Sequence, residues 1–225
     1  MFKKVLLVIF LLIFLFSAAN LGIYFYRNYK ADKDFTTVRN ASKQTLCDIY
    51  KKNNDIVGWI KINGTKVDYP IMQTKKEPEF YLRRNFAKKY SIAGTPFLDF
   101  RCDFVNIVRV KPKEYDDEGY KIPKDWLVYG HNMQSGIMFH DLLQYQDERF
   151  LATHDIIDVQ VLSKDGKKVT RCKFQILGVG FIKAKNRLYQ EAEYNKYPDK
   201  NVLILSTCDN VTEAGRFIVV AERKE

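Results

Sequence analysis

The C-terminal part of the chain contains Leu-Ile-Leu-Ser-Thr-Cys at residues 203–208, followed by Arg-Phe-Ile-Val-Val at residues 216–220. Apolar and β-branched runs of this length predict two β-strands. The first strand delivers Cys208 to its C-terminal end, and the second begins with Arg216. If the two strands are neighbours, a thiol and a guanidinium face one pocket. Because a thiol is a useful nucleophile only as thiolate and a nearby cation favours that form, the pair suggests cysteine chemistry.

The rest of the chain predicts a series of further short strands. They are expected at residues 56–62, 66–72, 95–100, 126–129, 155–163 and 169–181. The Asn63-Gly64 and Asp165-Gly166 pairs are typical of hairpin turns between such strands. Pro70 puts its strand at a sheet edge or ends it, because proline cannot donate a backbone hydrogen bond.

The other segments are expected to be peripheral. Short helices are predicted at 78–84 and 138–145, a loop at 111–124 and a polar connection at about 183–200. Many short strands at close spacing favour a mostly β fold over a parallel α/β sheet. We therefore expect one domain over residues 55–225, a closed barrel of about eight strands.

The N-terminus determines the expected compartment. Residues 1–4 carry two lysines, and the run from Val5 to Tyr26 contains no charged residue. A helix of that length spans roughly 30 Å of hydrocarbon, so residues 5–26 predict a single-pass anchor with a cytoplasmic tail and an extracellular domain. A signal peptide cleaved near Ser17-Ala18-Ala19 is the alternative. Residues 27–54 lack glycine and proline and predict a helical linker.

The chain is strongly basic, with 37 Lys and Arg against 27 Asp and Glu, a net charge of +10 over 225 residues. The cations are scattered, which indicates a solvated basic surface or attraction to an anionic cell envelope. No nucleic-acid-binding module is recognisable, so no nucleic-acid partner is expected.

Four cysteines occur, and their spacing matches no metal-binding motif. Cys47, Cys102 and Cys172 are expected to be buried free thiols or to include one disulfide. Three histidines could act with Cys208. His131 follows the strand 126–129 and begins a polar turn, His140 lies in an expected helix, and His154 precedes a strand. Catalytic groups often lie on loops at strand ends, which favours His131.

These residues together resemble the sortases, the membrane-anchored cysteine transpeptidases of Gram-positive bacteria. The resemblance rests on Leu-Ser-Thr-Cys at 205–208, on Arg216 and on Tyr-Gly-His-Asn at 129–132, and it runs from about residue 50 to the end. Two further stretches resemble the class B branch: one is 55–60, continuing to 67–73, and the other is 136–139 with the following Leu142-Leu143. One departure is Pro-Glu-Phe-Tyr-Leu at 78–82, where class B members often have Asn-Asp-x-Tyr-Leu. The resemblance implies a sortase-type β-barrel.

The resemblance also implies a role for each catalytic residue. Cys208 would attack the Thr–Gly or Thr–Asn carbonyl of a sorting signal and form a thioacyl intermediate. His131 would protonate the leaving amine and then deprotonate the incoming one. Arg216 would bind the substrate backbone and stabilise the oxyanion, and the backbone N–H of Asp209 is a second candidate donor.

The remaining residues would form the binding site: Ser206 and Thr207 would shape the pocket, and Tyr81 and Leu82 would line part of the peptide groove. The expected partners are surface proteins with a C-terminal sorting motif and an amine from a peptidoglycan precursor or cross-bridge. This chemistry needs no metal or organic cofactor. A cysteine peptidase that only hydrolyses is the closest rival, and a non-catalytic basic envelope-binding module is a rival of another class.

Overall fold

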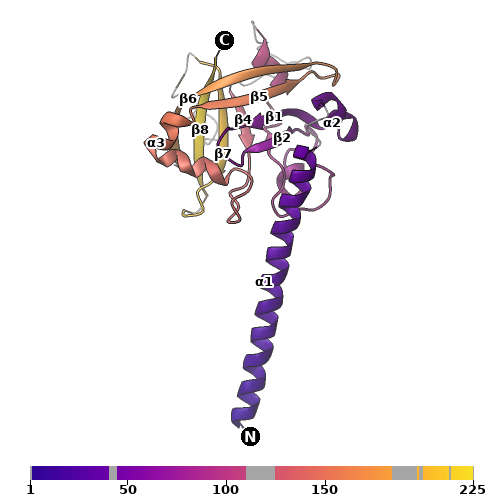
Figure 1. Ribbon diagram of the computed structural model, residues 1–225, viewed down its shortest axis with the longest axis vertical. Helices are drawn as coiled ribbons and strands as arrows, with labels where there is room; N and C mark the ends of the chain where they lie inside the picture. Colours follow the sequence, from indigo (N-terminus) through magenta and orange to yellow (C-terminus); the bar gives the residue numbers. More distant parts are fainter. Residues whose placement is uncertain are drawn as a thin grey trace.

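A computed structural model describes residues 2–40, 45–109, 125–183, 197, 200–212 and 214–224. Within them eight strands form a closed barrel in the order β1-β2-β3-β4-β7-β8-β6-β5 (Figure 1). The strands are β1 (Ile56–Lys61), β2 (Asp68–Met72), β3 (Phe97–Leu98), β4 (Trp126–Tyr129), β5 (Ile156–Leu162), β6 (Val169–Lys183), β7 (Val202–Cys208) and β8 (Gly215–Lys224). The expected closed barrel is confirmed.

The helices lie around this barrel and are mostly short. They are α1 (Phe2–Asn40), α2 (Leu46–Lys52) and α3 (Glu148–Thr153), together with the 3₁₀ helices η2 (Phe80–Arg83), η3 (Phe104–Val108) and η4 (His140–Gln146). The helices expected at 78–84 and 138–145 are therefore 3₁₀ turns, and α3 was not predicted. The loop expected at 111–124 and most of the connection at 183–200 lie outside the described residues.

The strand pattern explains the core. Alternate residues of β7 and β8 point inward, where Leu203, Leu205, Phe217 and Val219 join the main apolar cluster. Their neighbours point outward and form a second cluster on the outer face, made of Leu127, Val202, Ile204, Ile218 and Val220. A period of two along each strand therefore places the residues next to Cys208 on defined faces.

Pro70 sits inside β2, opposite Trp59 of β1. On its other side β2 pairs only with the two-residue strand β3, through Met72 and Phe97. β2 has neighbours on both sides in the closed barrel and continues to Met72, so the expected edge position or strand end at Pro70 is wrong. The proline is tolerated because the ladder with β3 involves only Met72, so Pro70 itself pairs only with β1 among the described residues.

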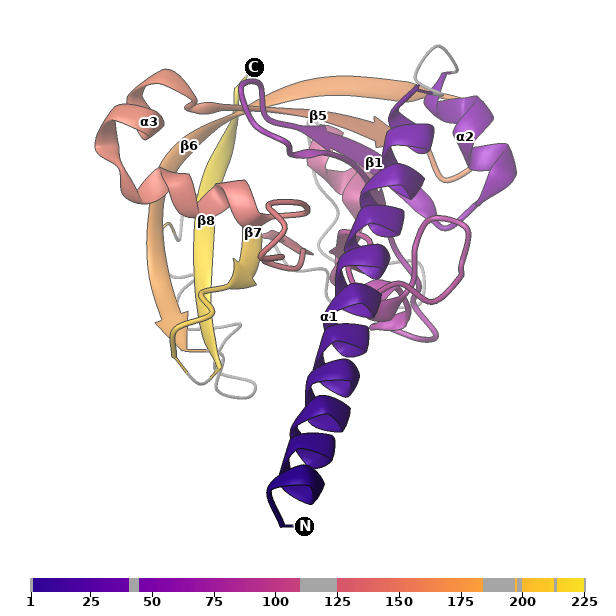
Figure 2. The ribbon, with the colours of Figure 1, turned by 60° about the horizontal axis from the view of Figure 1, so that its bottom comes forward.

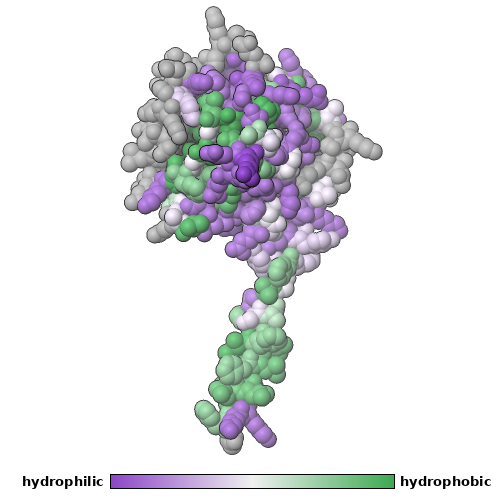
Figure 3. Space-filling model, turned by 60° about the vertical axis from the view of Figure 1, so that its left-hand side comes forward, coloured by the Kyte–Doolittle hydropathy of each residue, from purple (hydrophilic) through white to green (hydrophobic). Residues whose placement is uncertain are grey.

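Helix α1 is longer than the apolar run that begins it, since it continues without a break to Asn40. It is the one helix among the described residues that is long and apolar enough to cross a membrane. Its apolar side chains are exposed and form a hydrophobic stem that projects from the polar domain (Figure 3). The linker expected at 27–54 therefore consists of the end of α1 and the separate helix α2.

Candidate active site

Cys208 and Arg216 lie directly opposite each other at one end of the barrel. They are cross-strand partners in the antiparallel pair β7–β8. Their side chains share a face of the sheet because directly opposed residues do so, with Cβ atoms about 5 Å apart. That face is the outer one, since the neighbouring Thr207 and Phe217 are buried on the inner side. Both Cys208 and Arg216 are half-buried.

His131 reaches the same level from a third strand. β4 runs parallel to β7, with Tyr129 paired with Ser206. The N–H of Gly130 continues this ladder by donating to the carbonyl of Ser206 at 3.0 Å. His131 lies two residues after Tyr129, and Cys208 lies two residues after its partner Ser206. The two residues are therefore neighbours at the ends of adjacent parallel strands. A Cβ at Gly130 would overlap the ring of Phe139, which explains the glycine before the histidine.

The imidazole of His131 is fixed by a contact with η2. Its Nε2 lies 2.8 Å from the carbonyl oxygen of Leu82. A carbonyl can only accept, so Nε2 carries the proton and Nδ1 is the nitrogen left to take part in proton transfer. Burial lowers the pKa of His131, and the cations of Arg83 and Arg216 lower it further, although the bond to Leu82 opposes this. Arg216 therefore acts electrostatically on His131 and lies opposite Cys208.

Asn132 connects the two catalytic strand ends. Its Nδ2 donates to the carbonyl oxygen of Cys208 at 2.9 Å, and its Oδ1 accepts from Nδ1 of His140 at 2.8 Å. Asn210 donates to the Asn132 carbonyl at 3.3 Å. The sequence placed Asn132 in the motif but gave it no role. His140 thus contacts the site through Asn132, and the choice of His131 as the catalytic histidine stays a prediction.

The side chain of Asp209 organises the turn between β7 and β8. Its two oxygens accept from the N–H groups of Val211 and Thr212 and from the Thr212 hydroxyl, the last at 2.6 Å. The Thr212 hydroxyl, these N–H groups and the Arg216 charge hold the pKa of the carboxyl below its usual range. Its own N–H donates to the carbonyl of Gly215 at 3.2 Å. The N–H assigned to oxyanion binding therefore already has a partner.

The other expected pocket residues differ in position. Ser206 and Thr207 are buried beside Cys208, and the Thr207 hydroxyl has no hydrogen-bond partner among the described residues. The ring of Tyr81 is also buried, and its hydroxyl bonds to Asn53 and Asp55. Leu82 contacts the site through its backbone carbonyl. A groove role for Tyr81 and Leu82 stays a prediction.

The four cysteines are free thiols, so none of the possible disulfides is present. Burial raises the pKa of Cys102 to about 12 and that of Cys172 to about 11. Those two thiols are poor nucleophiles near neutral pH. Cys208 is half-buried and lies opposite Arg216, so it remains the candidate nucleophile among the four cysteines.

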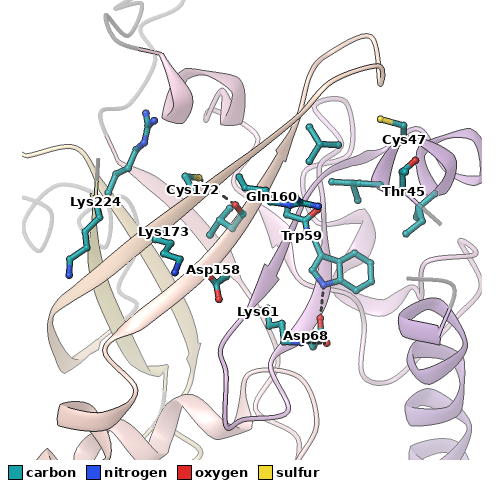
Figure 4. Close-up of a pocket in the computed structure, with 16 residues that line it drawn as sticks. Thr45, Cys47, Trp59, Lys61, Asp68, Asp158, Gln160, Cys172, Lys173 and Lys224 are labelled. Carbon is teal, nitrogen blue, oxygen red and sulfur yellow. Dashed lines mark hydrogen bonds and ion pairs between the residues drawn. The ribbon is translucent and has the colours of Figure 1, made fainter. Parts of the chain in front are cut away.

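A wide groove of about 990 Å³ lies elsewhere, between α2 and the outer face of β1, β5 and β6 (Figure 4). Trp59 lies in it and donates to Asp68 at 2.6 Å. It contains Cys47 and Cys172 but none of the expected catalytic residues. His154 makes its contacts elsewhere: its ring stacks on the ring of Phe150, with the two centroids 4.0 Å apart. No group of three or more potential metal ligands occurs among the described residues.

The chain is similar to known sortases in sequence and in structure. It is 34% identical over 164 residues to sortase B of Listeria monocytogenes, which covers 67% of this chain and 60% of that protein. Sortase B of Clostridium perfringens superposes with a TM-score of 0.60 at 25% identity, covering 79% and 98% of the two chains. Sortase B of Bacillus anthracis, solved with AAEK1, gives 0.68 at 22% identity, covering 89% and 99%. The chain matches no protein-family model.

Proposed function

Because the chain belongs to the class B sortases, we propose that it is a cysteine transpeptidase that cleaves a C-terminal sorting motif and transfers the acyl part to an amine. The observation that carries the proposal is the pairing of Cys208 with Arg216, with His131 at the end of the adjacent parallel strand. The chain aligns with about 60% of the Listeria relative's length.

In the first half-reaction the Cys208 sulfur attacks the carbonyl carbon of a Thr–Gly or Thr–Asn bond. The C–N bond breaks and a thioester forms, while the proton of the Cys208 thiol passes to Nδ1 of His131 and from there to the leaving amine. The guanidinium of Arg216 lies on the same face as the sulfur and balances the negative charge on the carbonyl oxygen. We assign the oxyanion to Arg216, since the N–H of Asp209 bonds to Gly215.

The second half-reaction reverses these roles. An amine attacks the thioester, Nδ1 of His131 accepts its proton, and Cys208 leaves as thiolate beside Arg216. The low pKa of His131 suits it to act as a base near neutral pH, because the free imidazole is then mostly neutral. The leaving thiolate returns the site to its starting charge.

The amine is proposed to come from a peptidoglycan precursor or cross-bridge. One solved sortase B is complexed with triglycine, which offers such an amine to that enzyme. A solved Staphylococcus aureus sortase B is complexed with its substrate. For this chain we propose surface proteins with a C-terminal sorting motif as acyl donors.

Membrane anchoring is the remaining part of the proposal. The apolar residues of α1 are exposed, and their composition and length match a bilayer span. We propose a short cytoplasmic tail with an extracellular barrel, because the proposed cell-wall amine lies outside the membrane. Cations flank the span on both sides, with Lys3 and Lys4 before it and Arg27, Lys30 and Lys33 after it. The catalytic domain then works on the outer side of the membrane.

The experiment that tests the proposal is a peptide-library cleavage assay on the full chain in detergent. Cys208→Ala is the matched inactive control, and triglycine is added to half of the reactions. A transpeptidase gives cleaved peptides whose acyl part moves to triglycine. Hydrolysis that triglycine leaves unchanged would instead favour a peptidase. Cleavage that survives Cys208→Ala would contradict the proposal.

A further inference from the structure

We infer that α1 docks the barrel on the bilayer with its catalytic end toward the lipid, and that a basic collar around the docking site binds anionic headgroups. The inference rests on the proposed membrane anchor. It adds a surface and a partner, an anionic bilayer face, to an activity argued from Cys208, His131 and Arg216.

Helix α1 contacts the barrel directly. Asn28, Ala31 and Phe35 are buried, at the spacing of one helix face. The ring of Phe35 meets that of Tyr69 in β2 edge-on, with centroids 5.4 Å apart. The amide of Asn85 donates to Asp34 at 2.7 Å. Helix and barrel are therefore joined by apolar and polar contacts.

The contacts between α1 and the barrel lie only a short distance along the helix from the apolar run. The apolar run ends at Tyr26, and the first buried residue of α1 is Asn28. At about 1.5 Å per residue, Phe35 lies roughly 14 Å along the helix from Tyr26. The headgroup region of each leaflet is about 5–8 Å thick. The docked barrel therefore begins close to the headgroups, with no flexible spacer between them.

The candidate active site lies at one particular end of the barrel. Figures 1 and 2 show the β7–β8 turn at the end of the barrel toward which α1 projects. β7 ends at Cys208 and β8 begins at Gly215, so Cys208 and Arg216 lie at that end. The C-terminus of β8 lies at the opposite end in both views. The ten residues of β8 separate the ends by about 30 Å.

Positively charged side chains surround the contact between α1 and the barrel. Arg27, Lys30 and Lys33 are exposed on α1 just past the apolar run. Arg84 and Lys89 are exposed in the segment that Asn85 ties to α1. We call these five residues the basic collar. Lysine and arginine next to a bilayer span attract anionic lipids within about a Debye length, and their long stems let the charged heads reach the headgroups.

Energy transfer to a headgroup-labelled lipid tests the orientation. The full chain carries a donor at Val211→Cys, beside the β7–β8 turn where Val211 is 86% exposed, or at Lys224→Cys. Both are made in a Cys47→Ser, Cys208→Ala background, which leaves the two buried cysteines. In phosphatidylcholine vesicles we expect stronger transfer from position 211 than from position 224. Equal transfer, or stronger transfer from 224, would overturn the inference.

Two variant sets test its parts. Phe35→Ala with Asn85→Ala should reduce the difference between the two positions, and an unchanged difference would show that docking does not set the orientation. Adding phosphatidylglycerol should raise transfer from position 211. Neutralising all five collar residues, with Arg27→Gln, Lys30→Gln, Lys33→Gln, Arg84→Gln and Lys89→Gln, should abolish that rise. Arg171→Gln with Lys173→Gln, on β6 near the far end of β8, should keep it. A rise that survives neutralisation of the collar would refute lipid binding there.

The measurement separates two kinds of failure because it needs no catalysis. A chain that does not associate with vesicles contradicts the proposed anchor. A chain that associates with position 224 nearer the lipid contradicts only the orientation. Peptide cleavage by the unlabelled chain reports on the transpeptidase proposal independently.

Discussion

The side-chain nitrogen of Asn132 lies 2.9 Å from the carbonyl oxygen of Cys208, which ties the nucleophile to the loop that carries His131. The other end of the same amide accepts from His140. The side chain of Asn132 thus joins the loop after β4 to the end of β7 and to the start of η4. The bond fixes the backbone at the sulfur, so its effect should be seen on turnover more than on substrate binding.

Asn132→Ala should lower kcat by about ten- to thirtyfold with little change in KM, since it removes the bonds to the Cys208 carbonyl and to His140, each worth about 1 kcal/mol. Asn210→Ala, which removes a longer bond to the Asn132 carbonyl, is the matched control and should have a smaller effect. A double-mutant cycle of Asn132→Ala with His140→Gln should be non-additive because the side chains bond to each other. Wild-type kcat in Asn132→Ala would remove the positioning role.

Arg216→Lys should lower kcat/KM by about 10²-fold, although the charge is kept. A planar guanidinium can make two oriented contacts to a developing oxyanion, and an ammonium cannot. Arg171→Lys, an exposed change on β6, is the control and should retain activity. If Arg216→Lys cleaves a cognate peptide at the wild-type rate, Arg216 does not stabilise the oxyanion.

Alkylation should distinguish the four thiols. Iodoacetamide near neutral pH should modify Cys208 readily in the folded chain, whereas Cys102 and Cys172 resist, because burial raises the pKa of each. Peptide mass spectrometry after timed quenching gives the rate at each cysteine. Unfolding in denaturant should equalise the four rates. Modification of Cys172 ahead of Cys208 in the folded chain would contradict the assignment of the nucleophile.

The pKa of His131 lies below its ordinary value of about 6.5 because of burial, so the unfolded chain binds the proton more tightly. Between the two pKa values the unfolded state holds more protons, and the free energy of unfolding falls as the pH decreases below about 6.5. Denaturant unfolding at several pH values should show this decrease, and His131→Gln should weaken it. An NMR midpoint for His131 at or above 6.5 would contradict the burial argument.

Gly215→Ala should destabilise the chain by about 1–3 kcal/mol and loosen the turn after Cys208. A Cβ there would overlap Asp209 and the hydroxyl of Thr212, which hold that turn. Gly180→Ala is the matched control, because its Cβ meets nothing within 4 Å. It should stay within about 0.5 kcal/mol of wild type. Chemical denaturation gives the free energy of unfolding of each variant. Equal values for the two variants would contradict the close packing of Gly215 against Asp209 and Thr212.

The sequence predicted the parts of the fold that depend on local patterns. β1, β5, β6, β7 and β8 follow apolar and β-branched runs, and their ends lie within a few residues of those expected. β3 is only two residues long, and η4 is a 3₁₀ helix, because tertiary contacts decide such short elements. α1 continues past Tyr26 since residues 27–40 contain no helix breaker, although the hydropathy pattern ends there.

The sequence predicts which residues belong to the candidate site, but it does not predict the hydrogen bonds that hold them in place. Motifs identified Cys208, His131 and Arg216, and the strand register brings them to one end of the barrel. The bond from His131 to Leu82 joins residues 49 apart, and the bond from Asn132 to Cys208 joins residues 76 apart. Such contacts depend on how distant loops pack. No local pattern indicates them.

The most direct test of the central claim is mass spectrometry of the full chain quenched in acid during turnover of a cognate sorting peptide. The account predicts an acyl adduct on Cys208 that carries the peptide up to its threonine, that hydroxylamine removes, and that triglycine depletes as product appears. Cys208→Ala should show neither adduct nor product. Product formation without a Cys208 adduct, or an adduct on another residue that triglycine discharges, would contradict it.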